Sequence, residues 1–264
     1  MLEHKGIQFF PFPLKQVKVK FERSSKVEEI ENFSKLKERR GLKHIDARSL
    51  NYFINGDFSG FIKATEDLIE SKQSAGLIEI LRTNTKISRV TSAAEEGKLF
   101  THKYHYAAEG TGFFILIKIV NQKLFEEFDC EGILLDVFNT GYGKKKSAGA
   151  GNFEVTGMLQ DFNEIKQPET STGFMTLSNY LPSVEDEITN PVYTYFVKYG
   201  KLGEYFSQSE KPFKKPLILF EPGSCFDTNK QSNLFGRCTR KGEIIPYKPA
   251  VIQYGYAFSI NYKH

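Results

Sequence analysis

The sequence has 264 residues, enough for two domains of ordinary size that each bury a core of their own. It is 40% hydrophobic and 26% charged, and its formal net charge of +4 is too small to require a nucleic-acid partner. The longest apolar run, residues 113–117, is far shorter than the ~20 residues of a membrane span, so we expect no membrane partner. Cys130, Cys225 and Cys238 lack C-x-x-C spacing, which predicts a reducing cytoplasm and no zinc site.

The first part of the chain is expected to combine a strand with helices. Residues 1–23 alternate apolar and basic side chains, which is the period of a strand. The strongly charged segment 27–40 has a helical or irregular pattern. Two short helices are expected at residues 47–54 and 58–69, and residues 55–57 (Asn-Gly-Asp) predict the turn between them.

The middle of the chain predicts a hairpin, a buried strand and a third helical segment. Residues 85–106 have the pattern of a protruding hairpin or a partly ordered loop between strands. Residues 113–120 are strongly apolar and predict a buried strand. Residues 123–138 are compatible with a helix, although Gly132 lies inside it at a cost of ~1 kcal/mol.

A polar, acidic stretch at residues 154–170 predicts a domain boundary. We therefore expect a first domain at residues 1–165 and a second at residues 166–264. The second domain should contain a short buried strand at residues 217–220 and a strand at residues 251–258, with a bulge or a close backbone approach at Gly255.

A glycine-rich loop follows the expected third helix and reads GYGKKKSAGAGNF from Gly141 to Phe153. Glycine adopts positive φ without steric cost, and exposed amides in such a turn form a concave nest that binds anions. Three consecutive lysines add mobile positive charge. The loop therefore predicts binding of a phosphate chain, and the alternative is a flexible surface loop with solvated lysines.

Two familiar phosphate-binding loops do not fit this sequence. The mononucleotide loop requires G-x-x-x-x-G-K-[ST] between a strand and a helix, whereas Lys146 and Ser147 follow G-Y-G-K-K after a helix. The dinucleotide fingerprint needs a helix after its glycines, and residues 153–157 predict a strand. Binding of ATP or NAD is therefore disfavoured, and we expect no cofactor.

In this context the loop resembles the glycine-rich loop of the RAMP superfamily, the RNA-binding subunits of CRISPR systems. Residues 87–100 resemble the hairpin region of its type III members. Leu-Ser-x-Tyr-Leu-Pro at 177–182 and Tyr-Gly-x-Ala-Phe at 254–258 resemble the family of fourth Csm subunits of type III-A interference complexes. The likeness covers most of residues 8–264. Such subunits normally open with a strand, a small-residue loop and a helix that have no counterpart here, so one edge of the first sheet is expected to need a partner or a rearranged strand.

The resemblance implies an α+β fold of two ferredoxin-like (RRM-like) domains in tandem, with the glycine-rich loop at the end of the first domain and a protruding hairpin. It implies a non-catalytic subunit that binds the 5′ handle of the guide RNA (crRNA). Such a subunit contacts the large polymerase-like subunit and the backbone RAMP subunits, with target RNA near the hairpin. Carried over position by position, the implied RNA-binding residues are Gly141, Tyr142, Gly143, Lys144, Lys145, Lys146, Ser147, Gly149, Gly151, Arg89, Tyr254 and Gly255.

Some members of the superfamily cleave precursor RNA, so a metal-independent endoribonuclease that processes CRISPR precursor RNA is the alternative function. General acid–base catalysis at neutral pH favours histidine. His102 and His105 are three residues apart in the expected hairpin, which would point them to opposite faces of a strand. We therefore assign no catalytic or metal-binding residue. A third hypothesis is an assembly module whose glycine loop docks protein without touching RNA.

Overall fold

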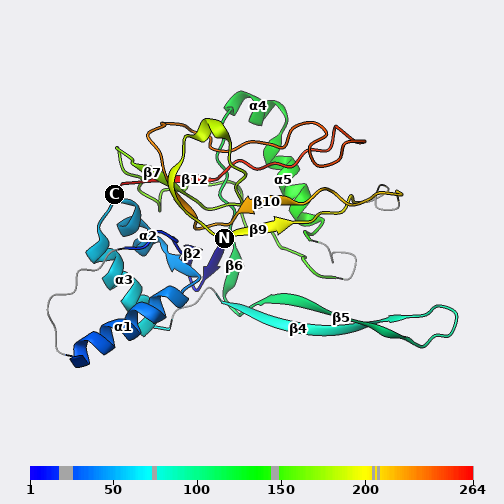
Figure 1. Cartoon of the computed structure of the whole chain (residues 1–264), viewed down its shortest axis with the longest axis horizontal. Coiled ribbons are helices and arrows are strands. Elements are labelled where there is room, and N and C mark those ends of the chain that lie inside the picture. Colours follow the sequence, from blue (N-terminus) through cyan, green and yellow to red (C-terminus); the bar gives the residue numbers. More distant parts are fainter. Residues whose placement is uncertain (18–25, 73–75, 144–148, 204–205, 207–208, 264) are drawn as a thin grey trace. The chain divides into compact units, whose positions relative to one another are not determined.

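The structure of the chain is a computed structural model (Figure 1). It describes residues 1–17, 26–72, 76–143, 149–203, 206 and 209–263. Two compact units are present: unit 1 comprises Met1–Ile115 and Ile165–His264, and unit 2 comprises Leu116–Glu164. The expected division into domains at residues 1–165 and 166–264 differs from this partition and stays a prediction.

The first sheet of unit 1 is antiparallel and has the strand order β3-β2-β1-β6. Its strands are β1 (Leu2–His4), β2 (Ile7–Pro11), β3 (His44–Asp46) and β6 (Thr111–Phe113). Lys5 and Gly6 join β1 to β2 with positive φ angles of 50° and 76°, the backbone that a tight hairpin turn requires. The expected strand character of residues 1–23 is confirmed for β1 and β2 and is wrong for residues 12–17, which are not strand. Residues 18–25 lie outside the described part of the chain.

Three helices accompany this sheet: α1 (Lys26–Gly41), α2 (Ala47–Ile54) and α3 (Phe58–Glu70). They confirm the helices expected at 27–40, 47–54 and 58–69. Two aspartates fix where α2 and α3 begin, because each satisfies a backbone N–H of the first turn. Asp46 accepts a 2.8 Å hydrogen bond from the amide of Ser49, and Asp57 accepts one of 2.9 Å from the amide of Gly60.

The helices and the first sheet enclose a core of aromatic and aliphatic side chains. Phe9 of β2 and Leu68 of α3 belong to one buried cluster. Phe53 of α2 is fully buried, and its ring centre lies 5.5 Å from that of Phe61 and 6.0 Å from that of Tyr262. Burial of each such side chain contributes about 1.5–3 kcal/mol. The contact with Tyr262 shows that α2 also packs against the C-terminal part of unit 1.

A long two-stranded hairpin projects from unit 1 (Figure 1). It consists of β4 (Leu77–Ile87) and β5 (Ala94–Ala107), paired in antiparallel register with an irregularity between Thr85 and Ile87. Its side chains are all exposed or half-buried. This confirms the protruding hairpin expected at residues 85–106, and the paired strands begin earlier than expected, at Leu77.

The second sheet of unit 1 has the order β12-β7-β11-β8 and is also antiparallel. Its strands are β7 (Gly173–Thr176), β8 (Thr189–Val192), β11 (Cys225–Asp227) and β12 (Ser259–Tyr262). A short 3-10 helix, η2 (Val184–Asp186), precedes β8. The core beside the sheet is aromatic: the rings of Phe174 and Phe235 stack 3.9 Å apart, and buried Tyr180 donates a 2.6 Å hydrogen bond to Asp186. Strands β9 (Tyr195–Lys198) and β10 (Leu217–Phe220) form a separate two-stranded sheet.

Unit 2 contains the helices α4 (Gln122–Glu127) and α5 (Cys130–Asn139). The sequence predicted one helix over 123–138, and the structure corrects this to two. The helical backbone is interrupted at Asp129, which has a left-handed φ of 43°. Asp129 caps α5 by accepting a hydrogen bond from the amide of Gly132. A Cβ at Gly132 would lie 2.3 Å from the Asp129 carboxylate, so glycine at this position makes room for the cap.

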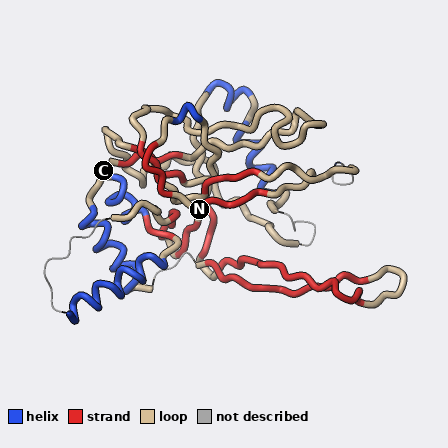
Figure 2. The backbone as a smooth tube through the Cα atoms, viewed as in Figure 1, coloured by secondary structure: helices blue, strands red, loops and turns tan. Residues whose placement is uncertain are grey.

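Three expected strands are wrong. Of residues 113–120 only Phe113 belongs to a strand, because no described strand pairs with the chain beyond β6. Phe113 and Ile115 are each 53% exposed, so the segment is not the buried strand that was expected. Residues 153–157 are loop (Figure 2). Residues 251–258 form irregular hydrogen bonds, such as Ala257 N–H to Phe235 O at 2.9 Å, and the terminal strand β12 begins only at Ser259.

The described chain is thus a mixed α+β protein built from several small antiparallel sheets, as expected at the level of fold class. The finer expectation of two tandem ferredoxin-like domains stays a prediction. None of the helices in the described ranges is long and apolar enough to cross a bilayer.

Candidate nucleic-acid interface

The glycine-rich loop of unit 2 begins where α5 ends and contains four glycines in the left-handed region of backbone space. Their φ angles are 82° at Gly141, 113° at Gly143, 79° at Gly149 and 75° at Gly151. A residue with a Cβ adopts such angles only at a cost of roughly 1–2 kcal/mol. The backbone path, and not only its flexibility, therefore selects glycine at these positions.

The two glycine pairs meet at the base of the loop. The amide of Tyr142 donates a 2.8 Å hydrogen bond to the carbonyl oxygen of Gly151. A Cβ at Gly151 would lie 1.8 Å from the Tyr142 carbonyl oxygen, and one at Gly141 would lie 3.2 Å from the Gly151 carbonyl oxygen. By contrast, no atom of the described residues lies within 4 Å of a Cβ placed at Gly143 or Gly149. The base is therefore tightly closed, whereas Gly143 and Gly149 leave backbone open to a ligand.

Aromatic rings support the base of the loop. The ring centre of Phe138, at the end of α5, lies 6.4 Å from that of Phe153 in an edge-on arrangement and 6.5 Å from that of Tyr142. Tyr142 is 67% exposed, which leaves its ring accessible for stacking. The predicted contacts Lys144, Lys145, Lys146 and Ser147 lie outside the described residues.

The β4–β5 hairpin carries a row of rings that the sequence analysis missed. Phe100, His102, Tyr104 and Tyr106 occupy alternate positions of β5, and neighbouring ring centres are 5.0, 6.4 and 6.4 Å apart. The Arg82 guanidinium lies 5.4 Å from the ring centre of Tyr104 and 5.5 Å from that of Tyr106. We call these five residues the hairpin ladder. The F-x-H-x-Y-x-Y pattern at residues 100–106 is the signal that would have identified it.

The ladder combines stacking groups with a cation, which is how proteins hold unpaired bases and the nucleic-acid backbone. The predicted contact Arg89 is exposed in the turn at the tip of the same hairpin. The strand register places His102 opposite Arg82 and His105 opposite Glu79, so the two histidines point to opposite faces, as expected. Among the described residues no cluster of three or more His, Cys, Asp or Glu side chains is arranged to hold a metal ion.

Tyr254 and Gly255, the remaining predicted contacts, differ in accessibility. Tyr254 is 66% exposed, and its ring centre lies 5.4 Å from that of Tyr256. Gly255 is buried: its carbonyl accepts a 2.8 Å hydrogen bond from Leu181, and a Cβ there would lie 2.7 Å from the Arg237 carbonyl oxygen. The predicted close backbone approach at Gly255 is confirmed, and contact of either residue with RNA stays a prediction.

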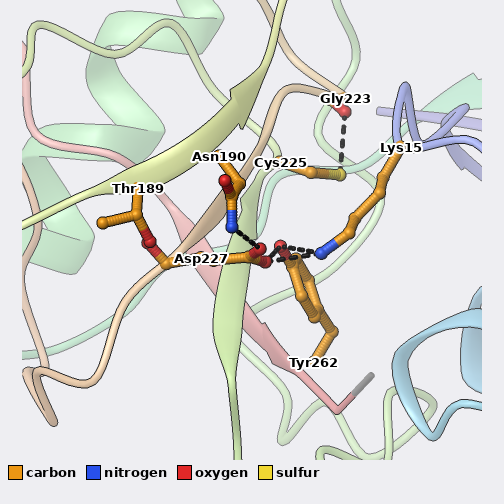
Figure 3. Close-up of polar contacts among 7 residues, drawn as sticks. All are labelled: Lys15, Thr189, Asn190, Gly223, Cys225, Asp227 and Tyr262. Carbon is orange, nitrogen blue, oxygen red and sulfur yellow. Dashed lines mark hydrogen bonds and ion pairs between the residues drawn. The ribbon is translucent and has the colours of Figure 1, made fainter.

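A polar cluster joins the N-terminal segment of unit 1 to its second sheet (Figure 3). Lys15 Nζ lies 2.5 Å from Asp227 Oδ1, and the Tyr262 hydroxyl donates a 2.6 Å hydrogen bond to the same oxygen. Asn190 donates to the other carboxylate oxygen at 3.2 Å. Burial opposes ionisation of Asp227, but the hydrogen bonds from Lys15, Tyr262 and Asn190 outweigh it and lower its pKa.

Burial keeps Tyr262 of this cluster and the neighbouring Cys225 in their protonated forms. Burial, assisted by the bond to Asp227, raises the pKa of Tyr262, so its hydroxyl stays protonated. Burial raises the pKa of the neighbouring Cys225 thiol to about 12, and its Sγ donates to the Gly223 carbonyl oxygen at 3.4 Å. We interpret the cluster as a structural link between the two sheets of unit 1.

No family model and no curated protein matches the sequence. Comparison with solved structures indicates the class of fold: the chain is similar in fold to a subunit of a type III CRISPR effector complex. The particular structure that it matches over its whole length is a chain of the Csm3–Csm4 subcomplex in the type III-A CRISPR-Cas interference complex. In that match the TM-score is 0.56 at 12% sequence identity, and the alignment covers 100% of this chain and 82% of the other.

Two chains of the type III-B Cmr-beta complex bound to cognate target RNA, one of them also with AMPPnP, match less well. The complex with AMPPnP gives a TM-score of 0.46 at 13% identity, covering 88% of this chain and 68% of the other. The second gives 0.40 at 12% identity, with coverages of 72% and 61%. The match to the Csm3–Csm4 subcomplex, at 12% identity, shows similarity of fold alone.

Proposed function

We propose that this chain is a non-catalytic, RNA-binding subunit of a type III CRISPR effector complex. In finer detail, it binds the 5′ handle of the guide RNA as the fourth Csm subunit does, and it bridges the large polymerase-like subunit and the backbone subunits. The similarity of its fold to a chain of the Csm3–Csm4 subcomplex supports this assignment. The observation that carries it is the closed glycine loop at the end of α5.

The loop offers what a ribose-phosphate strand needs. Gly143 and Gly149 have no side chain, and no described residue lies within 4 Å of either Cβ position, so a strand could approach within hydrogen-bond distance of the backbone. The bond between Tyr142 and Gly151 fixes the base, which reduces the entropy lost on binding. In the sequence, Lys144, Lys145 and Lys146 lie between the glycine pairs and supply positive charge for the phosphates.

The hairpin ladder supports a second part of the proposal, contact with target RNA. Its rings present faces on which bases can stack, and Arg82 provides a guanidinium for a phosphate or a base edge. Arg89 at the exposed tip extends this basic character. We therefore assign the hairpin to the guide–target duplex and the glycine loop to the guide handle.

A salt titration of RNA binding tests the role of the loop. Changing Lys144, Lys145 and Lys146 together to Ala should weaken binding of handle RNA and make the slope of log affinity against log salt shallower by about 2, since each phosphate contact on a single strand contributes ~0.7. The matched control changes the exposed Lys37, Lys63 and Lys72 to Ala, which removes the same charge elsewhere. Equal affinities and slopes for both triple variants would contradict the proposal.

Incubation of labelled CRISPR repeat RNA with excess purified protein in EDTA tests the proposed lack of catalysis. We expect the RNA to stay full-length. Cleavage that is lost on changing His102 or His105 to Ala would establish the endoribonuclease instead. The two histidines lie on opposite faces of β5, so cleavage that depends on only one of them would also identify the catalytic face.

A further inference from the structure

The two-stranded sheet of β9 and β10 has an apolar face that nothing in the described chain covers. The two strands pair antiparallel, with Val197 opposite Ile218. Tyr195, Val197, Tyr199 and Ile218 form the outer face and are 58%, 52%, 65% and 56% exposed. Leu219, on the opposite face, is 1% exposed. We call residues 193–203 and 211–220 the β9–β10 ribbon.

Aromatic rings line this outer face at strand spacing. Tyr195 lies in β9, and Tyr193 and Tyr199 flank this strand in the sequence at even spacings, the period at which the residues of a strand share a face. The rings of Tyr193 and Tyr195 are 6.4 Å apart, and the ring of Tyr199 stacks on that of Phe213 at 5.8 Å with an interplanar angle of 22°. Phe213 is itself 56% exposed. The face therefore presents a row of accessible rings along the ribbon.

The ribbon has more cations than acids around it. Five lysines occur at residues 193–203 and 211–220, and the connection between these ranges carries two acids, Glu204 and Glu210. Lys201 Nζ lies 5.9 Å from the ring centre of Phe213 on the aromatic face. Lys198 pairs with Leu217 on the face opposite Val197 and Ile218, and there it lines a shallow depression with Lys214, Lys215 and Gln253. Among the described residues none of these lysines forms an ion pair, and the five lysines outnumber the two glutamates of the connection.

We infer that the β9–β10 ribbon binds single-stranded RNA, with bases stacked on Tyr195, Tyr199 and Phe213 and phosphates held by Lys201 beside these rings. The inference deepens the proposed RNA-binding function and rests on it. Interleaved rings and cations are the composition of sequence-tolerant single-strand surfaces. A protein-docking face is disfavoured because lysine is depleted at the centre of protein interfaces. The ribbon belongs to unit 1, whereas the glycine loop belongs to unit 2, so the two surfaces can be varied separately.

Fluorescence anisotropy with a dodecamer of uridine and the full chain tests this surface. Stacking on one ring accounts for about a fivefold or larger change in affinity, so Tyr195→Ala with Tyr199→Ala should weaken binding by about 25-fold or more. The matched control is Tyr195→Phe with Tyr199→Phe, which keeps both rings and should stay within about twofold of the wild type. Circular dichroism and thermal melting establish that each variant is folded.

The lysine triple variant of the glycine loop is measured in parallel, so that failure of either site can be recognised. A folded Ala variant of the ribbon that keeps wild-type affinity overturns the inference, and if the loop variant alone is impaired, the proposed function stands without it. Loss of affinity in the ribbon variant alone supports the inference and contradicts the loop as the RNA site. A wild-type chain that binds no oligouridine overturns the inference; failure to bind handle RNA as well overturns the proposed function too.

A second test distinguishes RNA binding from a protein-docking role. Ultraviolet crosslinks from oligouridine should map to the peptide containing Tyr195 and Tyr199, and their absence from that peptide would overturn the inference.

Discussion

The amide of Tyr142 donates a 2.8 Å hydrogen bond to the carbonyl oxygen of Gly151, and this bond joins the two glycine pairs of the loop. The contact is possible because Gly151 has no Cβ, which would lie 1.8 Å from the Tyr142 carbonyl oxygen. The base of the loop is therefore a packed backbone structure. It presents Gly143 and Gly149 at positions where no atom of the described part of the chain fills the space around the Cβ.

This closure predicts that two glycines of the loop differ in their tolerance of alanine. Gly149 and Gly151 have φ angles of 79° and 75°, so each alanine carries a similar backbone cost of roughly 1–2 kcal/mol. Only Gly151→Ala also produces a steric clash, and it should open the bond to Tyr142 and weaken RNA binding further. Hydrogen exchange of the Tyr142 amide measures this directly. Faster exchange in Gly149→Ala than in Gly151→Ala would contradict the account of the closure.

The hairpin ladder predicts an asymmetry between the two faces of β5. Tyr104→Ala removes a ring that contacts Arg82 at 5.4 Å, and it should lower the affinity of the assembled complex for target RNA about fivefold or more. Thr101→Ala, on the opposite face and paired with Thr83, is the matched control and should bind as the wild type does. Equal affinities for target RNA in the two variants would remove the ladder from the RNA-binding surface.

The link between Lys15 and Asp227 predicts a loss of stability that exceeds that of an ordinary surface ion pair. The side chains of Lys15 and Asp227 are 20% and 23% exposed, and Asp227 also binds Tyr262 and Asn190. Lys15→Met should therefore lower the free energy of unfolding by about 1.5–3 kcal/mol. Arg48→Met disrupts an exposed pair with Asp67, where less than about 1 kcal/mol is expected.

Denaturant unfolding of these two variants measures the difference. A loss for Lys15→Met no larger than that for Arg48→Met would show that the polar cluster does not hold the two sheets of unit 1 together.

The ion pair of Arg237 and Glu243 predicts a specific acid sensitivity. Arg237 binds both carboxylate oxygens, at 2.8 and 3.0 Å, and with the Arg240 amide it lowers the pKa of Glu243 from 4.5 to about 2. Because the folded pKa lies below the unfolded one, this stabilisation is present above pH 4.5 and is lost as the pH falls toward 2.

Thermal melting of Glu243→Gln across this pH range checks whether the stabilisation by the ion pair decreases on acidification. The variant should be less stable than the wild type at neutral pH, and the difference should shrink on acidification. Glu187→Gln, at an exposed residue, is the control and should follow the wild type. A difference for Glu243→Gln that grows below pH 4.5 would contradict the assignment.

Local signals in the sequence predicted the local parts of the fold. The helices at 47–54 and 58–69 were predicted because apolar periodicity and an Asn-Gly-Asp turn act over a few residues, and the structure adds the Asp46 and Asp57 caps. The strand expected at 113–120 failed because an apolar run does not reveal whether a pairing partner exists. Likewise, no local pattern could reveal a contact between Lys15 and Asp227, which are 212 residues apart.

For the same reason the sequence predicted the glycine loop of the candidate site but missed the hairpin ladder and the β9–β10 ribbon. The positive φ of Gly141, Gly143, Gly149 and Gly151 agrees with the nest-forming backbone read from the G-x-G pairs. The hairpin ladder and the β9–β10 ribbon depend on strand register, which places alternate residues on one face only after the pairing is known. Their period-2 aromatic patterns were nevertheless visible in the sequence.

Ultraviolet crosslinking of the folded full chain to guide RNA bearing its 5′ handle, with the crosslinked peptides identified by mass spectrometry, tests the central claim most directly. We predict crosslinks in residues 141–153, with Tyr142 as the principal site because its ring is exposed beside the glycine backbone. Crosslinks that map only to unit 1, with none in residues 141–153, would contradict the assignment of the glycine loop to the guide handle.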